Sequence, residues 1–538
     1  MLRRILCALF PLPLLLSLAQ PASAQVNFSL QFVAQGFDRP TCVCAPPGPS
    51  NRLFVTEKDG LVRTLVNGQV QPGSWLNLTS KVDLTGQTGL VTMVFHPAYF
   101  QNGWVYFFYS DATASIRVER YRVPVPTNYQ IDPSSATTIL SVQDVIAFHN
   151  GGGMAFGPDG YLYVALGDRR KELQGTGCTA QDGSTLVGKL LRLDSGGNPA
   201  PGNPFVNDPL VDDRIYGFGL REPFRIAFDH ATGALYVSDV GDDAREEISV
   251  VPPGSPPPNF GWRVLEGTLC ASTLECTAFP CPGPQFIPPA FEYDSSGGCF
   301  AVVGGAVYRG NQIPELSGQY LFADWCSSRL FGLRWVEHRT VYSEELTDLV
   351  QVLPGGPFGA PNKLERPIHI TEDANGELLV LAMGPDVLLP LQKPALFRLQ
   401  PVPTQSLSAD DGELSLGSAQ PLRFDFDAGV AFAGRPYLLL GSASGYQPGI
   451  PVDGLLLPLS MDAYFSASLL GPSAVPLENS LGLLDAQGSA RAALMPGKFP
   501  PAAGLIGLVL HHAAVVLDPA QQGKVDFVSN PLAVALIP

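Results

Sequence analysis

Short apolar runs recur along the first three-quarters of the chain, each close behind a turn. Three runs follow nearly the same turn, at Gly157–Gly160, Asp229–Gly233 and Glu372–Gly376. The six runs are Leu53–Val55, Val105–Phe107, Leu162–Val164, Leu235–Val237, Tyr320–Phe322 and Leu378–Val380. A hairpin repeated every ~40–50 residues, with the surplus in loops, is typical of a propeller blade. The pattern predicts an all-β fold, a six-bladed β-propeller over about residues 28–400. A β-sandwich, the alternative, would not repeat one hairpin motif six times.

The composition changes after Pro401. Residues 403–538 contain no cysteine or tryptophan and only two lysines, Lys498 and Lys524. Runs such as Tyr437–Leu440 and Leu508–Leu510 lie between Gly, Pro and Asp turns, as short strands do. We expect a C-terminal all-β domain over 403–538, resembling a β-sandwich and without an assigned role, with its boundary near 402–412.

The N-terminus has the pattern of a secretory signal peptide. Arg3 and Arg4 precede an apolar run, Ile5–Leu18, and Ala22–Ala24 forms a small-residue cleavage site. The run is shorter than the ~20 apolar residues that a membrane span needs. We expect residues 1–24 to be a signal peptide, residues 25–402 to form the propeller, and the mature protein to be secreted or periplasmic with no membrane span.

Charge and cysteine content narrow the possible functions. The 538 residues carry a net charge of −16, which argues against a nucleic-acid partner because phosphate binding needs a basic surface. Of nine cysteines, all but Cys7 follow the predicted leader. The remaining even number predicts disulfide bonds in an exported protein, up to four, with the connectivity left open. The chain has no Cys-x-x-Cys-His motif for attaching a c-type haem.

The stretch from His149 to Asp168 carries the most specific chemical signal. In an uninterrupted hairpin around the Gly157–Gly160 turn, Phe156 would pair with Tyr161. The same register places His149 opposite Asp168, with Cβ atoms ~5 Å apart. A carboxylate raises the basicity of an imidazole and fixes its tautomer, as a general base requires. The adjacent Gly151–Gly153 would leave room for a flat ligand. A purely structural His–Asp hydrogen bond is the alternative.

Two further polar residues are expected near this pair. Arg221 and His149 each stand seven residues before a phenylalanine that ends a predicted strand, and Gln87 stands eight before another. Equivalent ends of propeller blades converge on the central channel. A base, a guanidinium and an amide around one cavity suit an anionic, planar cofactor.

Longer motifs follow one another through the propeller region. They are Gly86-Gln-Thr-Gly-Leu90 with Val94-Phe-His-Pro97, His149-Asn-Gly-Gly, Phe156-Gly-Pro-Asp-Gly-Tyr-Leu-Tyr163 with Gly167-Asp168, Gly219-Leu-Arg-Glu-Pro-Phe-Arg225, Asp239-Val-Gly-Asp-Asp243, Asn259-Phe-Gly-Trp262, Gly304-Gly-Ala-Val-Tyr-Arg-Gly310 and Phe322-Ala-Asp324. In these motifs the chain resembles the soluble glucose/sorbosone dehydrogenase family, six-bladed propellers that bind pyrroloquinoline quinone and Ca²⁺. The resemblance does not extend to the C-terminal region.

The resemblance implies a quinoprotein that oxidises a sugar or another alcohol and passes electrons to an external acceptor. It makes His149 the base that takes the substrate hydroxyl proton while hydride passes to the quinone, and Asp168 the residue that orients it. It places Gln87 and Arg221 against the cofactor. It assigns Ca²⁺ to the backbone carbonyls of Gly241 and Asp242, an ion that would polarise the quinone. Looser matches make Arg329 and Arg366 further partners for cofactor carboxylates.

Some positions depart from the glucose-oxidising members. Glu222 follows the arginine where those members have Asn, and Val240 precedes the glycine where they have Gln. The segments around Gly219, Asn259 and Cys270 resemble the Hedgehog-interacting-protein branch, whose animal members bind protein. That likeness implies that Cys270 and Cys276 belong to a disulfide-held blade loop. It also gives an alternative function, a non-catalytic propeller that binds a protein or glycan. A Ca²⁺-dependent lactonase is a third hypothesis, without support from these motifs.

Overall fold

The computed structural model describes residues 28–538 except for internal gaps. The gaps are 49, 114, 144–147, 170–177, 272–275, 277–278, 314–315, 337–338, 348–349, 353–363, 385–393, 402–405, 411–412, 446–448, 454, 473–475, 500–504, 507 and 520–523. The predicted signal peptide, residues 1–24, lies outside the described residues, as does part of the predicted boundary at 402–412. In the described ranges, no helix is long and apolar enough to cross a membrane.

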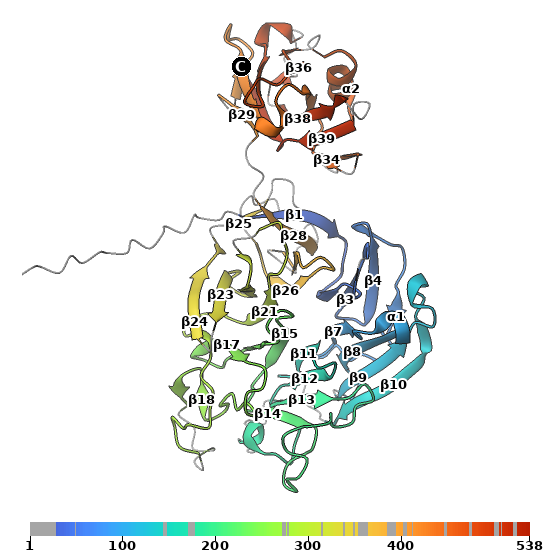
Figure 1. Ribbon diagram of the computed structural model, residues 1–538, viewed down its shortest axis with the longest axis vertical. Helices are drawn as coiled ribbons and strands as arrows, with labels where there is room; N and C mark the ends of the chain where they lie inside the picture. Colours follow the sequence, from blue (N-terminus) through green and yellow to red (C-terminus); the bar gives the residue numbers. More distant parts are fainter. Residues whose placement is uncertain are drawn as a thin grey trace, which may run out of the picture.

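The described residues between 28 and 401 form six large sheets, antiparallel except for one added edge strand, and one small two-stranded sheet (Figure 1). In the large sheets, listed from the inner strand outward, the first contains β2 (Pro40–Cys44), β3 (Arg52–Glu57), β4 (Leu61–Val66) and β5 (Gln69–Val70), with β6 (Leu76–Asn77) beside β4; the second contains β7 (Leu90–Phe95), β8 (Trp104–Ser110), β9 (Ile116–Arg122) and β10 (Asp132–Val142). The third contains β11 (Gly151–Phe156), β12 (Leu162–Leu166), β13 (Lys189–Leu193) and β14 (Ile215–Phe218); the fourth contains β15 (Pro223–Phe228), β16 (Leu235–Asp239), β17 (Arg245–Val251) and β20 (Phe291–Asp294). The fifth contains β21 (Val302–Val307), β22 (Gln319–Asp324), β23 (Leu330–Val336) and β24 (Arg339–Glu345); the sixth contains β26 (Pro367–Glu372), β27 (Leu378–Ala382), β28 (Ala395–Pro401) and β1 (Phe28–Gln35).

The six sheets close into a ring through their inner strands. β2 contacts β7, β7 contacts β11, and so on through β15, β21 and β26, which returns to β2. The last sheet is completed from the other end of the chain, because β1 pairs antiparallel with β28, and β25 (Val350–Val352) adds a parallel strand outside β1. Each of the six predicted apolar runs lies in the second strand of a sheet and is buried.

Every inner strand has a β-bulge at the same place. The register with the second strand shifts by one residue after the strand begins. The skipped residues are Thr41, Val91, Gly152, Phe224, Val303 and Ile368. A bulge strengthens the local twist and re-aims the side chains beside it. The repetition shows that the sheets are equivalent units, so corresponding residues before each bulge lie at the same end of the ring.

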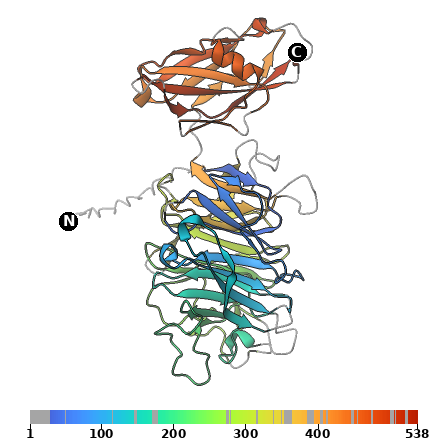
Figure 2. The same cartoon turned by 90° about the vertical axis from the view of Figure 1, so that its right-hand side faces the viewer.

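Residues 407–538 form further sheets that, in the described part of the chain, share no strand with the ring. One sheet contains β29 (Leu407–Ala409), β31 (Leu422–Asp427), β37 (Ser489–Leu494) and β35 (Leu477–Glu478); the other contains β30 (Glu413–Ser415), β40 (Leu532–Ile537), β38 (Val509–Asp518), β32 (Pro436–Ser442) and β36 (Leu481–Leu483), with β39 (Lys524–Val528) beside β38. Phe424 and Phe426 of the first sheet share a core with Leu439 and Val516 of the second. Figure 2 shows these sheets as a separate body beyond the ring.

The remaining short elements are few. They are the helices α1 (Tyr99–Asn102) and α2 (Ala463–Leu470), the hairpins β18 (Leu265–Glu266) with β19 (Leu269–Cys270) and β33 (Ile450–Val452) with β34 (Leu455–Leu457), and single 3-10 turns at Pro126–Asn128, Thr179–Gln181, Val430–Phe432 and Pro496–Lys498. Asp462 caps α2 by accepting a hydrogen bond from the Phe465 backbone N–H. The hairpin β18–β19 lies in the connection after β17, close to the residues discussed next.

Candidate functional site

His149 and Asp168 meet at the open end of the β11–β12 hairpin. The His149 Nδ1 and Asp168 Oδ1 atoms lie 2.8 Å apart, and each side chain is 5% exposed. The predicted pair is present, but by a different register. Phe156 pairs with Leu162 rather than Tyr161, and the bulge at Gly152 then shifts the strands back by one residue. The predicted register is wrong by one residue at the turn and omits the bulge, and these two errors cancel at His149 and Asp168.

A tryptophan completes the pair. The Trp262 indole N–H donates to the second carboxylate oxygen of Asp168, Oδ2, at 2.7 Å. The backbone N–H of Trp262 donates to the carbonyl of Gly219, which fixes the loop that carries the indole. Sequence reasoning missed this contact, because Trp262 entered only as part of a family motif. Both carboxylate oxygens of Asp168 have partners, and Nδ1 of His149 is hydrogen-bonded to Asp168. The imidazole atom of His149 available to a ligand is therefore Nε2.

Gln87 holds the backbone at His149, as the prediction of proximity required. The His149 backbone N–H donates to Gln87 Oε1 at 3.0 Å, and the Asn150 side-chain amide donates to the Gln87 carbonyl at 3.4 Å. His149 has a φ of 48°, in the left-handed region that a non-glycine residue rarely adopts. Two contacts from the preceding sheet thus stabilise an unfavourable conformation at the candidate base.

The glycines after His149 do not form the open ligand platform expected from the sequence. A Cβ on Gly151 would lie 2.6 Å from the Ala165 carbonyl oxygen, and one on Gly152 would lie 2.5 Å from the Val91 side chain. Protein atoms already occupy the space where side chains would project. The glycines are explained by the bulge and by the close packing of β11 against its neighbours, not by space for a ligand.

Arg221 reaches the same region from the next sheet. The Asp168 backbone N–H donates to the Arg221 carbonyl at 2.7 Å, and the guanidinium lies 5.4 Å from the Trp262 ring. Its Nη2 is 2.5 Å from Asp242 Oδ1, and Nη1 donates to the Val240 carbonyl at 3.2 Å. Burial opposes the charge, but Asp242 and Asp168 outweigh it and raise the pKa of Arg221. Within the described residues Nε has no hydrogen-bond partner.

The loop with Gly241 and Asp242 is held from behind by Glu266. One oxygen of Glu266, Oε1, accepts the backbone N–H groups of Asp242, Ala244 and Arg245 at 2.7, 2.8 and 3.1 Å. No hydrogen bond from the described residues ends on the carbonyl oxygens of Gly241 or Asp242. Likewise, in those ranges no three His, Cys, Asp or Glu side chains gather as a metal-binding group.

Buried acids near the loop have structural partners. Asp239 accepts the backbone N–H groups of Arg221 and Glu222 at 2.8 and 2.6 Å, so it anchors the chain entering β15. Asp324 accepts the Ala301 N–H in the same way in the next sheet. Burial raises the pKa of Asp239 to about 7 and that of Glu246 to about 8. Asp239 and Asp324 thus anchor the chain that enters the inner strands β15 and β21.

The direct contacts of the two remaining predicted residues are with residues outside the His149 cluster. Arg329 pairs with Glu345 at 2.8 Å and covers the Phe331 ring at 4.7 Å. Arg366 lies over the Trp325 ring at 5.5 Å, and its backbone N–H donates to Ser328 Oγ. Among the contacts of the described residues, none joins either arginine to His149, Asp168 or Arg221. The structure therefore joins Gln87, His149, Asp168, Arg221 and Asp242 by direct contacts, and Arg366 stands just before β26, as His149 stands just before β11.

Three disulfides form rather than the four that the cysteine count allows. They are Cys178–Cys276, Cys270–Cys281 and Cys299–Cys326, while Cys42 and Cys44 are free. Cys42 and Cys44 stand two apart on β2, a separation of ~6.6 Å along a strand, whereas a disulfide needs Cβ atoms ~3.8 Å apart. Cys270 and Cys276 do belong to a disulfide-held loop, each with its own partner.

Comparison with known proteins identifies relatives in a plant and in an animal. The chain is 27% identical to the HIPL1 protein of Arabidopsis thaliana over 355 residues, which is 52% of this chain and 50% of that protein. It is 28% identical to the human Hedgehog-interacting protein over 325 residues, which is 55% of this chain and 42% of that protein. The chain thus spans about half the length of these relatives.

A solved structure shares the fold. The PQQ-bound aldose sugar dehydrogenase of Streptomyces coelicolor aligns with a TM-score of 0.52 and 21% identity, covering 69% of this chain and 96% of that one. The family model described as glucose/sorbosone dehydrogenase matches residues 42–352, more than half of the chain. The match spans the inner strands from β2 to β21 and with them the whole His149 cluster. The chain belongs to the glucose/sorbosone dehydrogenase family.

Proposed function

We propose that this protein is an exported quinoprotein dehydrogenase that oxidises a sugar or another alcohol and uses pyrroloquinoline quinone and Ca²⁺. The observation that carries the proposal is the His149–Asp168 contact at 2.8 Å, with the second oxygen of Asp168 held by Trp262. Family membership and the name of the Streptomyces relative, a PQQ-bound aldose sugar dehydrogenase, support it.

In this proposal His149 is the general base. Asp168 accepts the Nδ1–H of the imidazole, so the tautomer with an unprotonated Nε2 is favoured, and Nε2 takes the hydroxyl proton of the substrate. Trp262 keeps the carboxylate from rotating, and Gln87 fixes the backbone from which the imidazole projects. The bound quinone would supply the hydride acceptor, and Ca²⁺ would polarise it. Reoxidation then requires an external electron acceptor.

The polar groups present fit an anionic cofactor and a hard cation. Arg221 has a buried Nε without a partner among the described residues, and Gln87 contributes an amide beside the base. The carbonyl oxygens of Gly241 and Asp242 are of the ligand type that Ca²⁺ prefers. One feature opposes the cofactor: the Asp242 carboxylate already neutralises Arg221. Arg329 and Arg366, on the fifth and sixth sheets, enter the proposal as more distant cofactor partners.

The proposal extends to the organisation of the chain. We take the six sheets of residues 25–402 as the blades of a six-bladed propeller and residues 403–538 as a separate sandwich-like domain. The predicted signal peptide at 1–24 and three disulfides support a secreted or periplasmic location, because disulfides persist in oxidising compartments.

The alternative is a non-catalytic propeller that binds a protein or glycan, with His149 and Asp168 as structure. It is favoured by the likeness to the Hedgehog-interacting protein and by the near-complete burial of His149 and Asp168. The disulfides Cys178–Cys276 and Cys270–Cys281 also fix loops around Trp262, as a recognition surface would need.

Reconstitution tests the two hypotheses. The purified full chain is mixed with pyrroloquinoline quinone and Ca²⁺, cofactor binding is followed by absorbance, and dye reduction is measured with aldoses and alcohols. We expect stoichiometric binding and substrate-dependent reduction that His149→Ala abolishes. His230→Ala, at an exposed turn, is the matched control and should retain activity. Absence of cofactor binding with excess Ca²⁺ overturns the dehydrogenase proposal and favours the binding module.

A further inference from the structure

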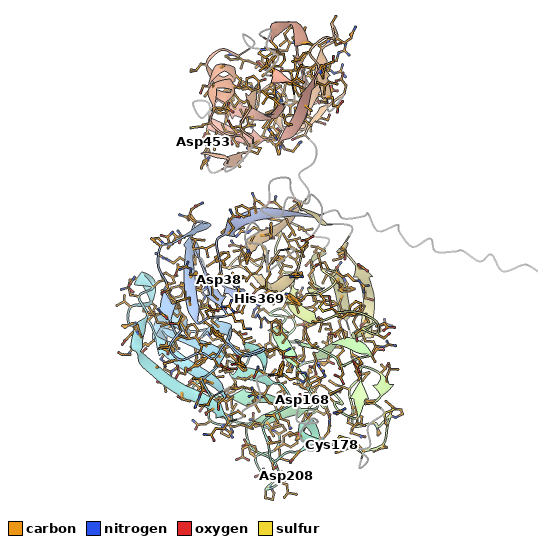
Figure 3. All side chains as sticks on the ribbon, turned by 180° about the vertical axis from the view of Figure 1, so that it is seen from behind. Asp38, Asp168, Cys178, Asp208, His369 and Asp453 are labelled. Atoms are coloured by element: carbon orange, nitrogen blue, oxygen red, sulfur yellow. A yellow bond between two sulfur atoms is a disulfide. The ribbon has the colours of Figure 1, made fainter. Side chains whose placement is uncertain are left out.

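A cavity of about 630 Å³ lies in the centre of the ring, away from the His149 cluster. All six inner strands contribute to its wall, with Val43, Met93, Met154, Arg225, Ala306 and His369 among the lining residues. His149 precedes β11, whereas the cavity is lined by Met154–Phe156 at the other end of that strand. Figure 3 shows His369 and Asp168 at separate places in the ring.

Arg225 extends from β15 across this channel to two other sheets. Its Nη2 donates to the Thr41 carbonyl, and its Nη1 donates to Thr92 Oγ1 at 3.2 Å and to the Phe224 carbonyl at 2.9 Å. The side chain is almost completely buried, since the residue is 4% exposed. Its Nε is also buried and has no partner in the described part of the chain. The guanidinium therefore has hydrogen-bonding capacity that the protein leaves unused.

The charge of Arg225 is also uncompensated. Among the described residues, no carboxylate lies within ion-pair distance of its guanidinium, whereas Arg221 pairs with Asp242 and Arg309 pairs with Asp229. Burial lowers the pKa of Arg225 to about 10, so the group is still a cation at neutral pH. A buried charge without a partner is unfavourable, and proteins normally offset it with an opposite charge.

The cavity wall offers a second donor. His369 Nδ1 accepts the Val43 backbone N–H at 3.1 Å, so the ring hydrogen of the neutral imidazole is on Nε2. Burial, and then Arg225, hold the pKa of His369 well below its usual range, so the ring adds a donor but no charge. Two acids also line the cavity. Asp373 is paired with Arg398 at 2.9 Å, and burial raises the pKa of Glu372 to about 7.

We propose that the central cavity binds a small oxyanion, a carboxylate or a tetrahedral anion such as sulfate or phosphate, through the Arg225 guanidinium. Oxyanions match the planar array of N–H donors in a guanidinium and supply the missing negative charge. A volume of about 630 Å³ admits such a group together with an apolar body. The site is separate from the dehydrogenase proposal and stands whether or not that proposal holds.

Calorimetric titration of the full chain tests the site. Sodium sulfate and sodium acetate are titrated separately in Tris buffer at constant ionic strength. We expect saturable binding of at least one anion, with a dissociation constant weakened at least tenfold in Arg225→Met and partly retained in Arg225→Lys. Tighter binding of sulfate would identify a tetrahedral ligand, and tighter binding of acetate a carboxylate. Arg192→Met is the matched control, because Arg192 is paired with Asp159 outside this cavity.

Locating the anion directly in a crystal tests the proposal even if Arg225→Met does not fold. Crystals of the unaltered chain are soaked in sodium selenate, a tetrahedral oxyanion like sulfate, and the anomalous signal of selenium is mapped. A peak beside the Arg225 guanidinium supports the site. The proposal is overturned if neither anion gives saturable heat, if Arg225→Met binds as tightly as the unaltered chain, or if selenate occupies only other positions.

Discussion

Arg221 and Arg225 stand four residues apart at the start of one inner strand, yet their electrostatic environments are opposite. Arg221 pairs with a carboxylate at 2.5 Å and lies among the candidate catalytic residues. Arg225, beyond the bulge at Phe224, projects into the channel and is bound by neutral oxygens. Although the two residues are close in sequence, one guanidinium meets a carboxylate and the other meets only carbonyl and hydroxyl oxygens. The comparison teaches that the charge of a buried arginine is either matched within the protein, as for Arg221, or left for a ligand to match, as we propose for Arg225.

The largest effect is expected at the His149 end. Asp168→Asn keeps the size of the side chain but no longer favours the base-competent tautomer, so kcat should fall by about 100-fold or more. The melting temperature should change little even though kcat falls. The measurement is the pH profile of dye reduction in the reconstituted protein. Trp262→Phe, which removes only the N–H to Asp168, should have a smaller effect. Unchanged kcat in Asp168→Asn would mean that the pair is structural.

The Arg221–Asp242 ion pair can be broken by replacing the acidic residue. Asp242→Asn removes the competing carboxylate but keeps the backbone carbonyl assigned to Ca²⁺. If Arg221 binds the cofactor, affinity for pyrroloquinoline quinone should rise by roughly tenfold, the equivalent of about 1.4 kcal/mol. Absorbance titration at saturating Ca²⁺ gives the dissociation constant. Weaker binding in Asp242→Asn would instead assign the Asp242 side chain to the cation.

Variants of Glu266 test how firmly the loop that carries Asp242, the ion-pair partner of Arg221, is held. Its single oxygen accepts three backbone N–H groups of the Asp242–Arg245 loop, and Glu266→Ala leaves them without that acceptor. Each buried donor left unsatisfied costs about 1–3 kcal/mol, although water can replace part of the loss. We expect a destabilisation of about 2 kcal/mol, measured by denaturant unfolding. Glu266→Gln keeps one acceptor oxygen and should lose less, and equal losses would contradict the role of that oxygen.

The smallest effect is expected at the cavity end and depends on pH. Burial raises the pKa of Glu372 from about 4.5 to about 7, so the folded state favours the neutral acid. Its contribution to stability is complete below pH ~4.5 and is lost as pH rises through 7, an effect of about 1–2 kcal/mol. Glu372→Gln should flatten this part of the stability–pH curve. The measurement is the melting temperature between pH 5 and 8, and parallel curves would refute the assignment.

The repeat of apolar runs located the second strand of each sheet, because a buried central strand leaves a strong local signal. The His149–Asp168 contact was also predicted, but only because the turn and the bulge at Gly152 shift the register in opposite directions. A bulge has no reliable sequence signal, since it depends on how the strand packs against its neighbours. The glycines beside His149 were misinterpreted for the same reason.

For contacts between distant segments, the spacing of residues predicted that Gln87 and Arg221 lie near His149, but it did not predict which atoms meet. Trp262 reaches Asp168 from a loop 94 residues away, and Arg225 reaches Thr41 across 184 residues. The even number of cysteines allowed a fourth disulfide, yet Cys42 and Cys44 are free, and their shared strand prevents their joining each other. In each case the tertiary arrangement decides which polar group meets which, and only the family resemblance carried part of that information.

The pairing of β1 with β28 has a consequence for how the protein is made. Ser29 donates a hydrogen bond to the carbonyl of Pro401, 372 residues later, so the sixth sheet is incomplete until almost all of the ring has been synthesised. Contacts of such long sequence separation form slowly, because a large loop must close before they gain any energy. The ring therefore cannot close until residue 401 is available, and any chain that stops before β28 leaves β1 without its antiparallel partner.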